Sequence, residues 1–290
     1  MKTRIFPFIL AILFISSCSL NYKLAKQPQK FDATRSAYSP VKKDMSGEKF
    51  SVETKSGPLP SLIFNDEFDQ KTILPHWKKS LYWCGPLFNE SDTEGGYYAQ
   101  DNFTFTDSTV RLWTRYQPKT FWNTKTNDSV TIKYGIGLLD LIPWVEGGGN
   151  DLINNFSVEC RAKMPDGKQE WPAFWICGYK QWPPEVDIFE FWKSEKGEFN
   201  NNFHYKGKDR NEQMPKSFQI PPDQRDDFHI YRLDVKEDRF EFYFDNYLYR
   251  TIPKIGHHLD KFTVIINNGI HDSPDHDTFL ELDWVRIYRL

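Results

Sequence analysis

Short apolar and aromatic runs, separated by turn residues, fill the chain from residue 58 to the last residue. Phe103-Thr104-Phe105 alternates with the two-residue period of a strand, and a second run at 110–115 follows an Asp-Ser turn. Further strands are predicted over residues 228–235, 240–244, 247–251, 262–267 and 279–288. An amphipathic helical period is nearly absent. The pattern therefore predicts an all-β fold, an antiparallel sandwich or barrel in one domain.

Residues 156–161 and 171–177 flank a Pro-Asp-Gly turn. This is a hairpin pattern, so the two runs are expected to pair. Cys160 and Cys177 lie at unequal distances from that turn and would not face each other across a simple hairpin. A disulfide between them is therefore disfavoured, and we expect two small buried side chains. No CxxC motif or Cys/His cluster occurs, which argues against a structural zinc site.

The first eighteen residues have the pattern of an export signal. Lys2 and Arg4 flank the start of an apolar stretch at 5–15, about half of the ~20 residues that a membrane-spanning helix needs. The stretch ends in Ile15-Ser16-Ser17-Cys18, which resembles the lipobox of bacterial lipoproteins, where cleavage precedes an acylated cysteine. The alternative is an ordinary secretory signal followed by an incidental cysteine.

Three parts of the chain are therefore predicted. Residues 1–17 are the lipoprotein signal peptide, and residues 18–57, rich in Lys, Ser, Gln and Pro, are a tether anchored by lipid on Cys18. Residues 58–290 are the folded domain. The protein is then exported and lipid-anchored to a bacterial membrane, at the outer membrane on its periplasmic or cell-surface side.

Composition narrows the classes of partner. The chain has 37 basic and 40 acidic side chains and a net charge of -3, so charge gives no argument for nucleic acid as a partner. The mean hydropathy of -0.64 excludes a polytopic membrane protein. Aromatic residues are 17% of the chain, with 24 Phe, 14 Tyr and 10 Trp, and this area has to be packed or used in binding.

One predicted strand carries the candidate chemistry. In residues 185–192, Glu185 and Asp187 share a face of a regular strand, whereas Glu190 would point into the core. A β-bulge near residues 188–189 would return Glu190 to the face of the other two. The two glutamates would then be roughly 13 Å apart between Cα atoms. Side chains leaning together from that distance can reach the ~5–5.5 Å carboxyl separation of a retaining glycosidase.

A solvated acidic strand face would give the same three-acid pattern, so the neighbouring residues matter. Trp171-Pro172-Ala173-Phe174-Trp175 lies just upstream, and Phe203-His204-Tyr205 lies just downstream. Exposed acidic faces are not usually flanked by tryptophans, whereas sugar rings stack on aromatic faces. Carboxylates and aromatics together favour a carbohydrate cleft.

The chain resembles glycoside hydrolase family 16, in the bulged form of laminarinases, agarases and carrageenases. Residues 185–190 are similar to the family's catalytic signature, residues 64–69 to its opening strand, and residues 283–288 to its closing strand. Residues 160–165 precede 171–175 as in many members. The resemblance implies a β-jelly roll of two antiparallel sheets with a concave substrate cleft, and hydrolysis inside a β-linked glucan or galactan.

The resemblance also implies roles. Glu185 is similar to the nucleophile, Glu190 to the general acid/base, and Asp187 to the assisting aspartate, with no cofactor required for catalysis. The positions that match cleft-lining residues are Trp171, Trp175, His204 and Asn267. A structural calcium held by Glu67 and Asp283 is expected on the same ground, with a plain surface pair as the alternative.

The substrate is left open at this point. A β-1,3- or mixed β-glucan comes first and an algal galactan (agarose, carrageenan or porphyran) second, while a non-catalytic glycan-binding lipoprotein is the alternative from another class. Candidate cleft bases for a sulfated galactan are Arg111, Arg115, Lys133, Lys206 and Lys208. Residues 122–144 and the glycines at 147–149 are expected to form cleft-edge loops. We expect a monomer whose partners are a polysaccharide and, through its lipid, a membrane.

Overall fold

The structure is a computed structural model that describes residues 22–23, 60–84, 87–91, 95–141, 152–165, 169–179, 181–191, 197–255, 261–272 and 276–290. Cys18, the signal segment and all of the tether except residues 22–23 lie outside the described residues. The limits of the three predicted parts, and the lipid anchor, therefore stay predictions.

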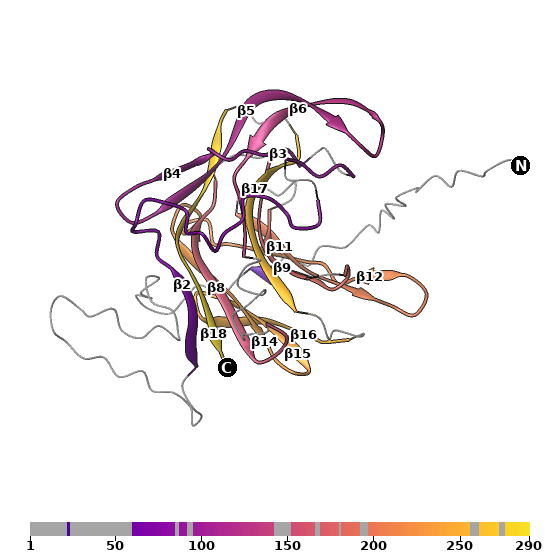
Figure 1. The fold of residues 1–290 in the computed structure, drawn as a ribbon. Helices are drawn as coiled ribbons and strands as arrows, with labels where there is room; N and C mark the ends of the chain where they lie inside the picture. The colour runs from indigo at the N-terminus through magenta and orange to yellow at the C-terminus, as the bar shows by residue number, and fades with distance from the viewer. Residues whose placement is uncertain are drawn as a thin grey trace, which may run out of the picture.

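The described residues form strands arranged in two sheets, which confirms the all-β prediction (Figure 1). The larger sheet has ten strands. Its order is β16 (Tyr247–Pro253), β15 (Arg239–Phe244), β14 (His229–Val235), β8 (Phe156–Lys163), β18 (Thr278–Arg289), β5 (Val110–Asn123), β6 (Asp128–Ile136) and β3 (Tyr97–Tyr98), with β2 (Ser61–Asp66) beside β18 and β4 (Phe103–Phe105) beside β5.

The smaller sheet has eight strands and carries the acidic strand near its middle. Its order is β1 (Tyr22–Lys23), β13 (Lys216–Gln219), β11 (Glu198–Lys206), β10 (Glu185–Glu190), β9 (Glu170–Gly178), β17 (Phe262–Ile270) and β7 (Leu138–Asp140), with β12 (Asn211–Gln213) beside β11. Pairing is antiparallel apart from β1 on β13 and β3 on β6. The two sheets are antiparallel-rich, as expected for the jelly roll.

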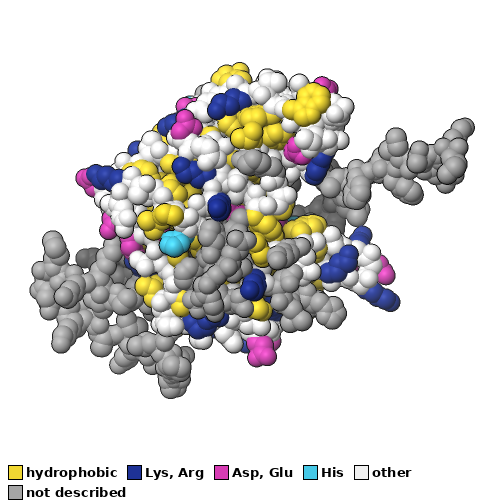
Figure 2. Space-filling model, viewed as in Figure 1, with side chains coloured by type: hydrophobic (Ala, Val, Ile, Leu, Met, Phe, Trp, Pro, Cys, Tyr) yellow, Lys and Arg dark blue, Asp and Glu magenta, His cyan; other side chains and the backbone are white. Residues whose placement is uncertain are grey.

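No helix among the described residues is long and apolar enough to cross a membrane. On the face shown in Figure 2, acidic and basic side chains are interspersed, in keeping with the small net charge.

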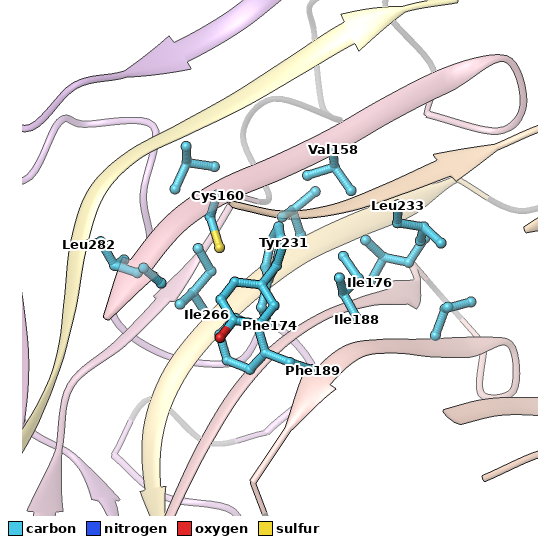
Figure 3. Packing of buried hydrophobic residues seen from close by; sticks show 14 of the residues in the cluster. Val158, Cys160, Phe174, Ile176, Ile188, Phe189, Tyr231, Leu233, Ile266 and Leu282 are labelled. Atoms are coloured by element: carbon cyan, nitrogen blue, oxygen red, sulfur yellow. The ribbon is translucent and has the colours of Figure 1, made fainter. Parts of the chain in front are cut away.

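The predicted hairpin of residues 156–161 and 171–177 is wrong. β8 pairs with β14 and β18 in the larger sheet, whereas β9 pairs with β10 and β17 in the smaller one. Each strand has an apolar face, and the two faces pack against each other across the core (Figure 3). Cys160 and Cys177 are both buried with free thiols, as expected, but they lie on strands of different sheets.

The core between the sheets is strongly aromatic. Phe174 and Phe189 of the smaller sheet lie 5.9 Å apart between ring centroids, and Phe189 lies 4.6 Å from Tyr231 of the larger sheet. All three are buried within one continuous cluster that spans both sheets. Much of the aromatic content noted in the sequence therefore packs the sandwich and leaves a smaller part for binding.

The prediction of loops for residues 122–144 is wrong for most of that segment. Residues 128–136 form β6, which pairs with β5 in a long hairpin, and residues 138–140 form β7 beside β17. Alternating apolar positions Val130, Ile132, Tyr134 and Ile136 explain the strand. The glycines at 147–149 lie outside the described residues.

The predicted bulge in β10 is present. Asp187 and Glu190 face Asn202 and Asn200 of β11, so two residues of β10 oppose one residue of its partner. The same irregularity appears against β9. Ile188 and Phe189 are consecutive, yet both are fully buried in the core cluster (Figure 3). The bulge therefore buries two apolar side chains in succession and returns Glu190 to the side of Glu185 and Asp187.

A single amide satisfies the backbone at this bulge. The buried Asn201 of β11 donates a hydrogen bond from Nδ2 to the Ile188 carbonyl oxygen. We expect Asn201→Ala to leave that buried carbonyl without its donor and to lower the free energy of unfolding by about 1–3 kcal/mol. Chemical denaturation checks this, with the exposed Asn211→Ala expected to change stability by less than about 0.5 kcal/mol. Equal stability of both variants would contradict the role of Asn201.

Candidate active site

A cleft of about 620 Å³ lies over the smaller sheet, and the three acidic side chains of β10 line it. Glu185 and Glu190 face Cys177 and Ala173 of β9, which are four residues apart. This register reproduces the separation expected from the sequence. The other described residues of the lining are mostly aromatic, apolar or glycine: Leu81, Tyr82, Trp83, Asn89, Gly95, Gly96, Tyr98, Ile136, Leu138, Trp171, Ala173, Trp175, Cys177, Gly178, Gln181, Trp182, Asn267 and Gly269.

Glu185 lies at the start of β10 with its side chain 18% exposed. Trp182 Nε1 donates a hydrogen bond to Glu185 Oε2 at 3.2 Å. His204, directly opposite on β11, places Nε2 3.4 Å from Glu185 Oε1. Both neighbours favour the ionised carboxylate, because one is an N–H donor and the other can carry positive charge.

Asp187 is the deepest of the three acids. Its side chain is 6% exposed, and its Oδ2 lies 3.4 Å from His204 Nε2. His204 is itself held by Asn202, whose Nδ2 lies 2.9 Å from Nε2 and whose Oδ1 accepts a hydrogen bond from the Phe203 N–H at 2.9 Å. His204 therefore touches both Glu185 and Asp187 from the neighbouring strand.

Glu190 is positioned by one tryptophan. Trp171 Nε1 donates a 2.7 Å hydrogen bond to Glu190 Oε1. The Trp171 carbonyl in turn accepts a 3.4 Å hydrogen bond from Asn267 Nδ2, and Asn267 Oδ1 accepts one of 2.9 Å from Trp175 Nε1. Trp171, Trp175 and Asn267 thus form a hydrogen-bonded row beside Glu190 on β9 and β17.

Crowding three acids in a buried site raises all of their pKa values. Burial, and secondarily the charge of Asp187, raise the pKa of Glu190 to about 8 against the opposing Trp171 hydrogen bond. Burial raises the pKa of Asp187, and burial together with Asp187 raises the pKa of Glu185, against the opposing effect of His204. The pKa of Glu185 is raised to about 8 as well, so the two glutamates are not distinguished by burial alone. His204 Nε2 lies 3.4 Å from both Glu185 and Asp187, which favours placing negative charge on that pair and the proton on Glu190. Glu185 accepts the Trp182 hydrogen bond and is more exposed than Asp187, which favours the charge on Glu185.

A metal does not fit this chemistry as a catalyst. The ligand atoms of Glu185, Asp187 and His204 lie within 4.8 Å of one another, close enough to share a cation. Such a cation would occupy the Glu185 carboxylate. It would therefore compete with the nucleophile role that the resemblance implies for Glu185.

The proposed calcium ligands are each engaged by an arginine. Arg286 donates to Glu67 Oε1 and Oε2 at 2.8 and 2.9 Å, and Arg161 donates to Asp283 Oδ2 at 2.7 Å. A divalent cation at either carboxylate would compete with a guanidinium group. The residues present therefore do not favour a calcium site.

The sequence did not single out several aromatic residues of the cleft. Trp182 is 53% exposed and lies three residues before Glu185, and Trp83 is 44% exposed with its ring 5.8 Å from Trp175. Tyr82 and Tyr98 also line the cleft. The adjacent aromatic residues Tyr82 and Trp83 could have signalled this wall. Their distance along the chain from β10 hid the connection.

The basic residues suggested for a sulfated substrate do not appear in the described lining, which contains no Lys or Arg. Arg111 pairs with Glu281 at 3.3 Å, and Arg115 stacks over Trp113. Lys133 lies on β6, Lys206 is the last residue of β11, and Lys208 lies two residues beyond that strand. The charged groups of the described lining are the three acids.

Comparison with known proteins finds similarity to the same family. The family model "Glycosyl hydrolases family 16" matches residues 152–268. A glucan endo-1,3-β-glucosidase of Cryptopygus antarcticus is 25% identical over 202 residues, which cover 66% of this chain and 68% of that protein. Glucan endo-1,3-β-glucosidase A1 of Niallia circulans is 23% identical over 296 residues, covering 83% of this chain but only 40% of that relative.

Solved structures show the same fold. The endo-β-1,3-glucanase of Pyrococcus furiosus superposes with a TM-score of 0.64 at 24% identity, covering 79% of this chain and 94% of that one. The region matched by the family model includes β9 and β10, which carry the three acids and the tryptophan row. Sequence and fold are therefore both similar to glycosyl hydrolases family 16, in agreement with the resemblance read from the sequence.

Proposed function

We propose that the protein is an endo-acting retaining glycoside hydrolase whose substrate is a β-1,3- or mixed β-glucan. The observation that carries the proposal is the bulged strand, which puts Glu185, Asp187 and Glu190 on one face of an aromatic cleft. Two relatives that span most of this chain are glucan endo-1,3-β-glucosidases, which supports the choice of glucan.

Glu185 and Glu190 each have a role in both steps of a double displacement. Ionised Glu185 attacks the anomeric carbon while protonated Glu190 gives its proton to the leaving oxygen, so the glycosidic bond breaks as a glycosyl ester forms. Glu190, now a carboxylate, takes a proton from water, and the resulting attack on the anomeric carbon releases Glu185. Two neighbours influence the ionisation of Glu185: Asp187, which lies deeper on the same strand, and His204 on the neighbouring strand.

The environment suits these ionisation states. The raised pKa of Glu190 keeps its carboxyl group protonated near neutral pH. The hydrogen bond from Trp171 holds Glu190 Oε1 in place. When Glu185 becomes esterified its negative charge disappears, which lowers the pKa of Glu190 and favours its change from acid to base.

The cleft favours a neutral glycan. Its described lining offers aromatic faces, amides and acids, which suit hydroxyl-rich rings and repel sulfate esters. An agarose-like neutral galactan fits this lining better than carrageenan or porphyran does. The second candidate, a non-catalytic glycan-binding protein, has the same aromatic lining in its favour. It does not account for a nucleophile and an acid that are both positioned by hydrogen bonds.

The proposal extends to location on the sequence evidence alone. Export, acylation of Cys18 and a tether through residues 18–57 would hold the hydrolase at a bacterial membrane surface. Substrates too large to cross a membrane have to be cut outside it, which agrees with an anchored enzyme. A monomer is expected for the anchored form.

Glu185→Gln should abolish turnover, because the amide is a poor nucleophile of the same shape. We expect reducing-end release from laminarin or lichenan to fall by at least about 10³-fold with folding intact. Agarose and carrageenan complete the panel and test the alternative substrates. Glu198→Gln makes the same chemical change at the start of β11, away from the described lining, and should keep activity within about twofold. Retention of more than a few per cent of activity by Glu185→Gln would contradict the nucleophile assignment.

Glu190→Gln should stabilise the protein increasingly as pH rises. The pKa of Glu190 is about 8 in the native state against an ordinary 4.5, so the native state holds a proton that the unfolded chain has lost between those values. Native stability therefore decreases from pH 4.5 to 8 on account of this group, and glutamine removes that decrease. The melting temperature of the variant minus that of wild type should grow from pH 5 to pH 8.5 in calorimetry. A difference independent of pH would show that Glu190 titrates normally.

Cys18→Ala should release the full-length protein from membranes, because it removes the acylated thiol. Membrane and soluble fractions of cells expressing wild type and variant are compared by immunoblot. Cys84→Ala, a cysteine of the folded part, is the matched control and should leave the distribution unchanged. Equal membrane association of Cys18→Ala and wild type would rule out the lipobox interpretation.

A further inference from the structure

The β5–β6 hairpin extends an apolar face beyond the core. Along β5 the inward positions Val110, Leu112 and Thr114 are buried, and the next position in the same alternation, Tyr116, is 61% exposed. Tyr116 lies directly opposite Tyr134 of β6, with the two rings edge to face at 5.4 Å. Figure 2 shows hydrophobic side chains at the surface in the region where Figure 1 places β5 and β6. We call Tyr116 and Tyr134 the tyrosine pair.

The tyrosine pair adjoins the catalytic cleft. Tyr134 packs against the small cluster that contains Tyr98, Ile136 and Leu138, and these three residues line the cleft. Gly96, also in the lining, approaches so closely that a Cβ there would lie 3.2 Å from the Tyr134 carbonyl oxygen and 2.6 Å from Ile136 Cγ2. The surface of the cleft therefore runs on to Tyr134 and then to Tyr116.

The pair nevertheless lies outside the catalytic centre. Glu190 pairs with Ala173 of β9, Ala173 pairs with Asn267 of β17, and Asn267 pairs with Leu138 of β7. Leu138 is therefore three strands away from Glu190, a distance of roughly 14 Å across the sheet. Tyr134 lies four residues further back along the chain from Leu138. A short oligosaccharide held over Glu185 and Glu190 would not reach the pair, whereas a long polymer would.

We propose that the tyrosine pair is an accessory binding surface for the pyranose rings of a polysaccharide chain that leaves the catalytic cleft. Tyrosine offers both an apolar ring face for the C–H side of a sugar and a hydroxyl for its rim. The exposed Asp277 adds a polar group beside Tyr116, because its Oδ1 accepts a 3.2 Å hydrogen bond from the Tyr116 N–H and holds the carboxylate there. The proposal rests on the glucan hydrolase function proposed above and adds a preference for long chains.

The same hairpin supplies a matched control. Trp122 is 57% exposed, close to Tyr116 in exposure, but it lies opposite Ser129 near the hairpin tip. Its strand neighbour Phe121 faces the small cluster of Phe88, Tyr97 and Ile132, so Trp122 points to the other side. Loss of Trp122 removes a comparable exposed aromatic without touching the extension of the cleft.

The test measures binding in the full-length Glu185→Gln protein, which prevents turnover. Titration calorimetry compares laminarin with laminaritetraose as ligands. Adding Tyr116→Ala should weaken laminarin binding roughly three- to tenfold and leave laminaritetraose binding unchanged. Tyr116→Phe, which keeps the ring, should restore most of the loss, and Trp122→Ala should bind both ligands as the parent does.

Each other outcome has a distinct meaning. Laminarin binding unaffected by Tyr116→Ala would overturn the accessory surface and leave the hydrolase proposal intact. Equal weakening of both ligands would also overturn it, because the pair would then act within the catalytic cleft or through the fold. Failure of the parent to bind either ligand, with the protein folded, would overturn the glucan proposal and this inference with it.

Discussion

The structure depends on the cost of burying carboxylates in a β-strand. β10 is apolar on the core side and acidic on the cleft side, and a regular alternation would force Glu190 into the cluster of Phe174, Phe189 and Tyr231. The bulge resolves this by placing two core residues in succession, and Asn201 satisfies the backbone where the sheet ladder is interrupted. The antiparallel neighbours β9 and β11 then supply Trp171 and His204 at the level of the acids.

The acids remain electrostatically unfavourable even when they are correctly placed. Burial raises the pKa values of Glu185, Asp187 and Glu190, and the charge of Asp187 raises those of the two glutamates further. A tryptophan N–H donates to each glutamate, and His204 lies close to both Glu185 and Asp187. Those N–H donors favour the charged forms that burial disfavours. Three buried acids with raised pKa values therefore share one face of the cleft, an arrangement typical of a functional site.

The sequence predicts local strand patterns well, but it does not predict which strands pair over long distances along the chain. Glu185, Asp187 and Glu190 lie within six residues, so face and bulge followed from alternation and from the cost of burying an acid. The strands at 156–161 and 171–177 were located, but a turn motif says nothing about which sheet each strand joins, and their pairing was wrong. Trp83 reaches the cleft only because its segment folds against Trp175, a contact between residues 92 positions apart. No periodicity carries that information.

In the hairpin of β5 and β6, the alternation of apolar side chains that builds the core continues beyond the core and leaves aromatic rings exposed. Its inward positions alternate from Val110 to Tyr116, yet Tyr116 is left at the surface, whereas Val130 and Ile132 nearer the hairpin tip pack with Phe88 and Tyr97. An uncovered aromatic face on a two-stranded ribbon invites non-specific association. Here a bulge between Tyr116 and Lys119 bends the ribbon, and the Thr120–Thr131 hydrogen bond of 2.9 Å keeps its tip polar. The exposed rings are thus confined to the part of the hairpin that adjoins the cleft and to Trp122 on its other side. A sequence that restricts exposed aromatics to these places, when alternation would allow more of them, is better explained by binding than by incomplete packing.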